Sequence, residues 1–173
     1  MKYFIFSCLF ALLVFTIDTY GQDNFTYDTD IVFGENMTDE YTSLRNGAVK
    51  TNTPVWSGGS CAFVSGDSDK LTYPPQSAIK SIRFIITLTT TTESILDFGN
   101  SITVTASGGT VTTANISTPT IYVDGSAGTT ITTSQAEVVI TTATSFKSSS
   151  FKIGDGLDGS IDKVELYSTA LSA

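Results

Sequence analysis

The chain has 173 residues, of which 17 are acidic, 9 are basic and none is histidine, so its formal net charge is −8. An acidic balance without clustered Lys and Arg excludes a phosphate-tracking nucleic-acid surface and an electrostatic attraction to anionic membranes. The lack of histidine excludes Cys–His and Ser–His nucleophile pairs.

The N-terminal segment has the pattern of a secretory signal peptide. Lys2 precedes an apolar run of about fifteen residues, shorter than the roughly 20 needed to span a bilayer, and Gly21 offers a small residue for cleavage. We therefore expect residues 1–21 to be a signal peptide and residues 22–173 to form one secreted domain. Cys61 would be the single cysteine of the exported chain, and we expect it to be a small buried hydrophobe.

The early part of the domain is irregular, with edge strands expected at residues 31–33 and 48–50. Residues 53–56 are expected to form a loop or an edge, because Pro54 cannot donate to a central ladder. We find no convincing helical periodicity after the signal peptide. Thr, Ser, Val and Ile dominate instead, and Gly, Asn and Asp interrupt them at short intervals, which favours an all-β chain.

Alternation of side chains is clearest at residues 82–88, where Ile82, Phe84, Ile86 and Leu88 would share one face and Arg83 the other. Short strands separated by Gly and Asp turns continue to the C-terminus, at 94–98, 102–105, 111–114, 120–123, 129–132, 136–140, 151–153 and 161–167. This pattern predicts a two-sheet antiparallel β-sandwich.

The last strand contains a carboxylate in an unexpected place. Strict alternation puts Asp162 on the same face as Val164 and Leu166, which would direct its charge toward the core. A carboxylate there requires hydrogen bonds, a cation or a metal, since burying an uncompensated charge costs several kcal/mol. Asp162 is thus expected to have a structural partner of one of these kinds.

Four segments resemble, in order, the LamG-like (concanavalin A-like lectin/glucanase) jelly-roll domains. They are residues 59–66 (GSCAFVSG), 120–125 (TIYVDG), 151–154 (FKIG) and the closing stretch 159–172 (GSIDKVELYSTALS). The resemblance implies a jelly roll whose members bind sugars or proteins, or cleave glycans. It does not identify a ligand, because function depends on the site and not on the fold.

Carboxylates suggest a structural Ca²⁺, a cation that prefers several oxygen ligands. Asp155, Asp158 and Asp162 lie within eight residues of one another, and folding could bring Asp67 and Asp69 alongside. Asp–Gly and Gly–Asp are also ordinary turn dipeptides, so hydrogen bonding is the alternative explanation.

Glycan binding needs an aromatic platform for the apolar face of a sugar. Trp56, the single Trp, is the leading candidate, followed by Tyr73 and Tyr41, with core packing as the alternative for each. Tyr122 alternates away from Ile121 and Val123, although the sequence does not say which face is inside.

Catalytic residues are not evident, because paired carboxylates at glycosidase spacing on one strand are missing. We therefore expect a secreted, non-catalytic recognition or adhesion module that binds a glycan or a cell-surface protein, with carbohydrate as the leading class of ligand. The alternative is a structural subunit of a surface layer, filament or virion, and a glycoside hydrolase is more remote.

Overall fold

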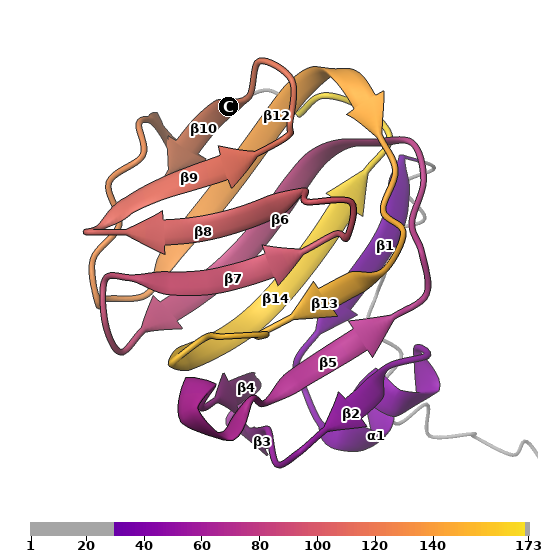
Figure 1. Ribbon diagram of the computed structural model, residues 1–173, viewed down its shortest axis with the longest axis vertical. Helices are drawn as coiled ribbons and strands as arrows, with labels where there is room; N and C mark the ends of the chain where they lie inside the picture. The colour runs from indigo at the N-terminus through magenta and orange to yellow at the C-terminus, as the bar shows by residue number, and fades with distance from the viewer. Residues whose placement is uncertain (1–29, 172–173) are drawn as a thin grey trace, which may run out of the picture.

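The computed structural model describes residues 30–171, and these residues form two antiparallel β-sheets packed face to face (Figure 1). This arrangement confirms the prediction of an all-β sandwich. The predicted signal peptide lies outside the described residues. Within residues 30–171, no helix is long and apolar enough to cross a membrane.

The larger sheet, here sheet A, has eight strands in the order β11-β10-β12-β6-β14-β4-β3, with β1 also paired to β14. Both β1 and β4 lie along the edge of β14 that β6 leaves free, with β4 at its start and β1 beyond. The strands of sheet A are β1 (Ile31–Asn36), β3 (Val55–Ser57), β4 (Ser60–Phe63), β6 (Ile79–Leu88), β10 (Thr120–Val123), β11 (Ser126–Ala127), β12 (Ala136–Phe146) and β14 (Gly159–Tyr167).

The smaller sheet, here sheet B, has six strands in the order β2-β5-β13-β7-β8-β9. One isolated β-bridge pairs Thr110, at the β9 edge of sheet B, with Thr130. Thr130 lies in the segment between β11 and β12, two strands of sheet A. The strands of sheet B are β2 (Val49–Thr51), β5 (Lys70–Tyr73), β7 (Glu93–Asp97), β8 (Thr103–Ser107), β9 (Thr110–Ala114) and β13 (Phe151–Ile153).

Strand β6 follows the alternation expected from its sequence. Ile82, Phe84, Ile86 and Leu88 are all buried between the sheets, whereas Arg83 points to the outer face of sheet A. β6 pairs with both β12 and β14, so it is a central strand whose outward side chains lie in the middle of that outer face. The position of Arg83 therefore follows from the pattern of buried residues on either side of it.

Aromatic rings join the two sheets in the core. Phe33 of β1 meets Tyr73 of β5 and Phe151 of β13 edge-on, with ring centroids 4.9 and 5.0 Å apart. Phe98, just after β7, stacks on Phe151 at 4.9 Å. Such pairs add about 0.5–1.5 kcal/mol each beyond the area that they bury. Cys61 is buried and unpaired with another cysteine among the described residues, as expected.

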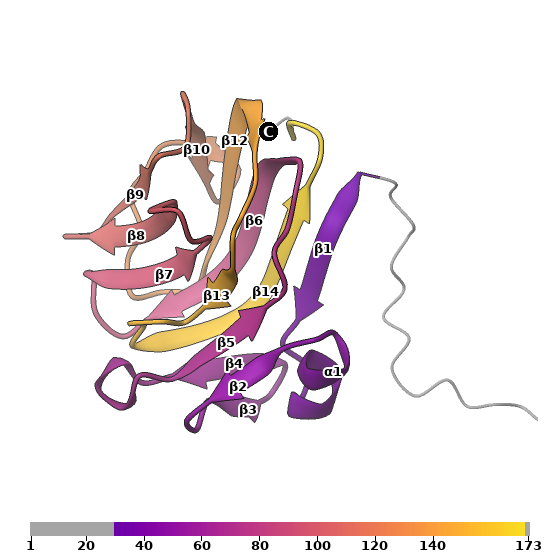
Figure 2. The ribbon, with the colours of Figure 1, turned by 45° about the vertical axis from the view of Figure 1, so that its right-hand side comes forward.

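One helix was not predicted. Asp39 caps helix α1 (Glu40–Arg45) by accepting a hydrogen bond from the Thr42 amide at 2.7 Å. In Figure 1 and Figure 2 the helix lies beside β2 at one end of the sandwich. One 3-10 turn, η1 (Ser65–Asp67), follows β4. Conversely, residues 129–132 do not form a strand of their own and contribute only the Thr130 bridge.

The predicted core-facing position of Asp162 is wrong, because strand β14 contains a β-bulge. Ile161 pairs with Ile86 and Lys163 pairs with the next residue, Ile85, so Asp162 is the extra residue between them. The bulge shifts the alternation by one position, which buries Ile161 together with Val164 and Leu166. Asp162 is displaced to the surface, where its carboxylate accepts a hydrogen bond from Gln135 Nε2 at 2.6 Å.

Candidate functional site

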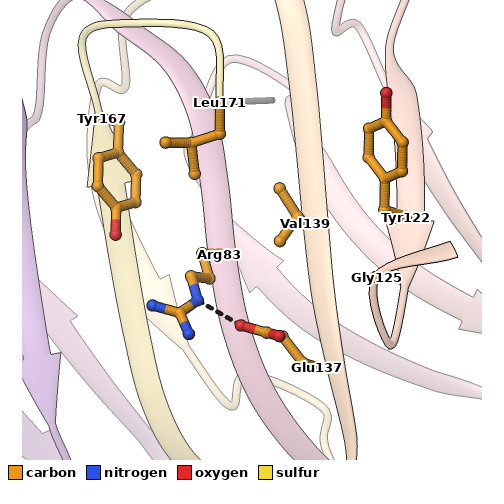
Figure 3. Close-up of a pocket in the computed structure, with 7 residues that line it drawn as sticks. All are labelled: Arg83, Tyr122, Gly125, Glu137, Val139, Tyr167 and Leu171. Carbon is orange, nitrogen blue, oxygen red and sulfur yellow. Dashed lines mark hydrogen bonds and ion pairs between the residues drawn. The ribbon is translucent and has the colours of Figure 1, made fainter. Parts of the chain in front are cut away.

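A pocket of about 310 Å³ opens on the outer face of sheet A (Figure 3). This volume is at the lower end of the range for small-molecule sites. Strands β6, β10, β12 and β14, the β10–β11 turn and the C-terminal tail contribute to the pocket, which we call the tyrosine pocket. Its lining residues are Arg83, Tyr122, Gly125, Glu137, Val139, Tyr167 and Leu171.

The lining side chains face outward because their neighbours along each strand are buried. Val138 on β12 and both Val164 and Leu166 on β14 lie in the core. Alternation then directs Glu137 and Glu165 to the other face. Arg83 pairs across the ladder with Glu165 on one side and Val139 on the other, so strand register gathers these side chains.

Charged groups form a connected network beneath one end of the pocket. The Arg83 guanidinium donates through Nε to Glu137 and through Nη1 to Glu165 at 3.1 Å. Glu165 also accepts from the Tyr167 hydroxyl at 2.7 Å and forms an ion pair with Lys163 at 2.6 Å. A single guanidinium thus holds two carboxylates, and Figure 3 shows the bond to Glu137 at the end of the pocket away from Leu171.

The contacts of Glu165 and Tyr167 determine the charge that each carries at neutral pH. Burial alone would raise the pKa of the Glu165 carboxyl, but hydrogen bonds from Lys163 and Tyr167, with the charges of Lys163 and Arg83, hold that pKa below its usual value. Burial, with the hydrogen bond to Glu165, raises the pKa of Tyr167 to about 12. At neutral pH Glu165 is therefore ionised and Tyr167 is a neutral hydrogen-bond donor.

Two tyrosines stand on opposite sides of the pocket. Tyr167 lies on β14 beside Leu171, and Tyr122 projects from β10 across from it, with Val139 between them (Figure 3). Tyr122 pairs with Val139 across the ladder, and its strand turns back at Asp124 and Gly125, which have φ of 50° and 75°. Two successive positive φ values are those of a type I′ hairpin turn, which suits the predicted Asp–Gly turn.

Ser81 holds the C-terminal tail over this face. Its hydroxyl donates to the Thr169 carbonyl at 2.8 Å and accepts from the Leu171 amide at 2.9 Å, and the residue is buried. These two bonds fix the turn after β14 and bring Leu171 into the pocket wall. The tail is thus part of the site.

The residues predicted to form a glycan platform lie elsewhere and apart from one another. Trp56 is half-buried on β3, where the Lys50 ammonium lies 5.9 Å from its ring centroid. Tyr73 is 2% exposed and belongs to the core, so the prediction of a surface platform at this residue is not supported. Tyr41 on α1 is 75% exposed, and its part in ligand binding stays a prediction.

The five aspartates predicted to bind calcium have separate protein partners or positions. Asp155 pairs with Lys70 and Lys152, Asp158 accepts from the Ser65 amide and hydroxyl, and Asp69 accepts from two backbone amides. Asp162 contacts Gln135, as described above, and Asp67 lies in the 3-10 turn. Within residues 30–171, no three Asp, Glu, Cys or His side chains are grouped to hold one ion, and calcium binding stays a prediction.

Sequence reasoning did not find the tyrosine pocket. Its residues come from separate segments, between Arg83 and Leu171, that only the sheet order brings together. One signal was present, because Tyr122 alternates away from Ile121 and Val123. Comparison with known proteins does not add to this: no family model, no curated protein and no solved structure matches the chain.

Proposed function

We propose that this domain is a non-catalytic carbohydrate-recognition module that binds a sugar in the tyrosine pocket. The observation that carries the proposal is one pocket with tyrosines on two sides and a charged hydrogen-bonding network at one end. An exported LamG-like jelly roll, as the sequence resemblance implies, is part of the same proposal.

Sugar recognition requires apolar surface and hydrogen-bonding groups side by side. The Tyr122 ring, Val139 and Leu171 supply apolar surface for the C–H face of a pyranose ring. Glu137 Oε1 accepts a hydrogen bond from Arg83. Among the described residues, neither Glu137 Oε2 nor the Tyr122 hydroxyl takes part in a hydrogen bond. These two oxygens are available to the hydroxyl groups of a sugar.

The same network argues against glycoside hydrolysis. A glycosidase needs one carboxylic acid with a raised pKa to protonate the leaving group. Contacts with Lys163, Tyr167 and Arg83 instead keep the pKa of Glu165 low, so this group is a poor proton donor at neutral pH. Glu165 therefore does not fit the role of the acid, and the function that we propose is binding without cleavage.

A glycan array with the purified domain tests the proposal, comparing the natural chain with Tyr122→Ala. We expect one family of glycans to bind the natural chain and the variant to lose at least tenfold in affinity. Tyr41→Ala is the matched control, because Tyr41 is an exposed tyrosine on the distant helix α1. Equal losses in both variants, or no glycan bound by the natural chain, would reject the proposal.

A protein-binding structural subunit is the second candidate. The observation in its favour is exposed apolar surface near two sheet edges, at Val49 on β2 (65% exposed) and Val55 on β3 (59% exposed). Exposed edge strands can pair with another chain. Self-association with rising protein concentration, in the absence of sugar and abolished by Val55→Lys, would favour this function.

Calcium is a separate proposal, since none of the five aspartates lines the tyrosine pocket. Its test is the melting temperature of the domain in calcium and then in excess EDTA. A ligand that binds only the folded state raises the melting temperature. A fall with EDTA would support a structural calcium ion, and identical values would reject it.

A further inference from the structure

We infer that the tyrosine pocket selects uncharged sugars and rejects acidic ones, an inference that rests on the proposed function. The geometry that carries it is the pairing of the pocket's cation with carboxylates. Proteins commonly bind the carboxylate of a uronic acid, or a sulfate ester, through Arg, whose planar fork matches these anions. Whether Arg83 is available for such a contact therefore decides the class of sugar.

Arg83 is the single cationic residue among those lining the pocket. Its Nε bonds to Glu137 and its Nη1 bonds to Glu165, so two carboxylates already face its one positive charge. The second nearby cation is Lys163, whose Nζ lies 2.6 Å from Glu165 Oε1 and which does not line the pocket. No cationic charge at this site is left uncompensated among the described residues.

The surroundings of the pocket add negative charge. Asp124, next to the lining residue Gly125, accepts a hydrogen bond from the Glu137 amide at 2.9 Å, which places a third carboxylate beside the pocket. An incoming carboxylate or sulfate that approached Arg83 would lie close to the carboxylates of Glu137 and Glu165. Like charges at such distances disfavour binding, and a partly desolvated site screens them less than water does.

An uncharged sugar meets no such conflict. Its hydroxyl groups are donors as well as acceptors, so they can donate to Glu137 Oε2 and exchange a hydrogen bond with Tyr122 without breaking the contacts of Arg83. Its C–H face can pack against Val139 and Leu171. The ion pair between Arg83 and Glu137 thus disfavours acidic sugars and leaves the binding of neutral sugars unaffected.

Matched glycan pairs test the inference. The array would carry galactose oligomers beside galacturonate oligomers of equal length, and neutral agarose oligomers beside sulfated carrageenan oligomers, together with a broad set of other neutral glycans. We expect the natural chain to bind neutral glycans and to bind the acidic member of every pair at least tenfold more weakly. Glu137→Gln should raise binding of acidic glycans at least tenfold, because it frees part of the Arg83 charge.

Glu40→Gln is the matched control, since it removes the same charge from the distant Glu40–Lys50 pair on α1 and β2. It should leave the preference unchanged. Acidic glycans bound as tightly as neutral ones by the natural chain would overturn the inference and leave the proposed function standing. An equal gain in both variants would also overturn it, and the absence of binding to any glycan would reject the proposed function as well.

Discussion

Replacing Glu165 by Gln tests whether the network beneath the tyrosine pocket stabilises the domain. The side chain of Glu165 is 5% exposed and is held by Arg83 at 3.1 Å, by Lys163 at 2.6 Å and by the Tyr167 hydroxyl at 2.7 Å. The neutral amide can still accept a hydrogen bond, but it cannot form either ion pair. The change therefore isolates the charge of the carboxylate.

The expected cost follows from how deeply the partners are buried. Breaking a fully buried pair costs about 3–5 kcal/mol. The side chains of Arg83 and Lys163 are 34% and 28% exposed, so solvent weakens both pairs. We expect Glu165→Gln to lower the free energy of unfolding by about 2 kcal/mol at pH 7, a large share of the roughly 5–15 kcal/mol of a small domain.

The effect of this variant should depend on pH. Because the folded-state pKa of Glu165 lies below its ordinary value of 4.5, the ionised carboxyl stabilises the fold above pH 4.5. That contribution is lost as the pH falls through the lowered pKa. The difference between the natural chain and the variant should thus be largest at neutral pH and shrink steadily in acid.

Urea unfolding at pH 7 and pH 3 measures both effects. Glu137→Gln is the control, because its carboxylate contacts the same Arg83 while its side chain is 36% exposed, and it should cost only about 0–1 kcal/mol. A loss of unfolding free energy below about 0.5 kcal/mol for Glu165→Gln at pH 7, or equal losses at both pH values, would show that the charge of Glu165 does not stabilise the domain.

Substitutions at three further positions have defined outcomes. Ser81→Ala removes both hydrogen bonds to the tail, so we expect the free energy of unfolding, measured in urea, to fall by about 1–2 kcal/mol and glycan binding to weaken. Ser81→Thr keeps a hydroxyl group and should partly restore both. Gly154→Ala should lower the free energy of unfolding by at least about 3 kcal/mol or prevent folding, as judged by circular dichroism. The φ of Gly154 is +84°, and an added Cβ would lie 2.2 Å from the Phe63 ring. Phe84→Ala should cost about 3–5 kcal/mol in the same unfolding assay, because Phe84 is fully buried in a central strand and truncation leaves a cavity.

Local patterns predicted the sheets well where one face of a strand is buried. β6 is the clearest case, since its alternating Ile82, Phe84 and Ile86 are all in the core. The Asp124–Gly125 turn was equally readable, because turn chemistry is set by adjacent residues. These features depend on neighbours in the sequence, which is why the sequence contains enough information to predict them.

Features that depend on partner strands were not predictable in the same way. The bulge at Asp162 follows from the registers of Ile161 and Lys163 against β6, so strict alternation assigned the carboxylate to the wrong face. Helix α1 is too short to show a period, although its Asp39 cap is a local signal. The tyrosine pocket requires the order of four strands, which spacing along one chain does not encode.

If a sugar binds between Tyr122 and Tyr167, the backbone amides around both tyrosines should respond to it. Amide chemical-shift mapping by NMR tests this binding site, with the labelled domain titrated by the tightest-binding neutral glycan from the array. We predict that shifts concentrate at the residues lining the tyrosine pocket, Tyr122 and Tyr167 among them, with the Trp56 indole unmoved. Saturable shifts centred on Trp56 or Tyr41, with the tyrosine pocket unchanged, would contradict binding at this site.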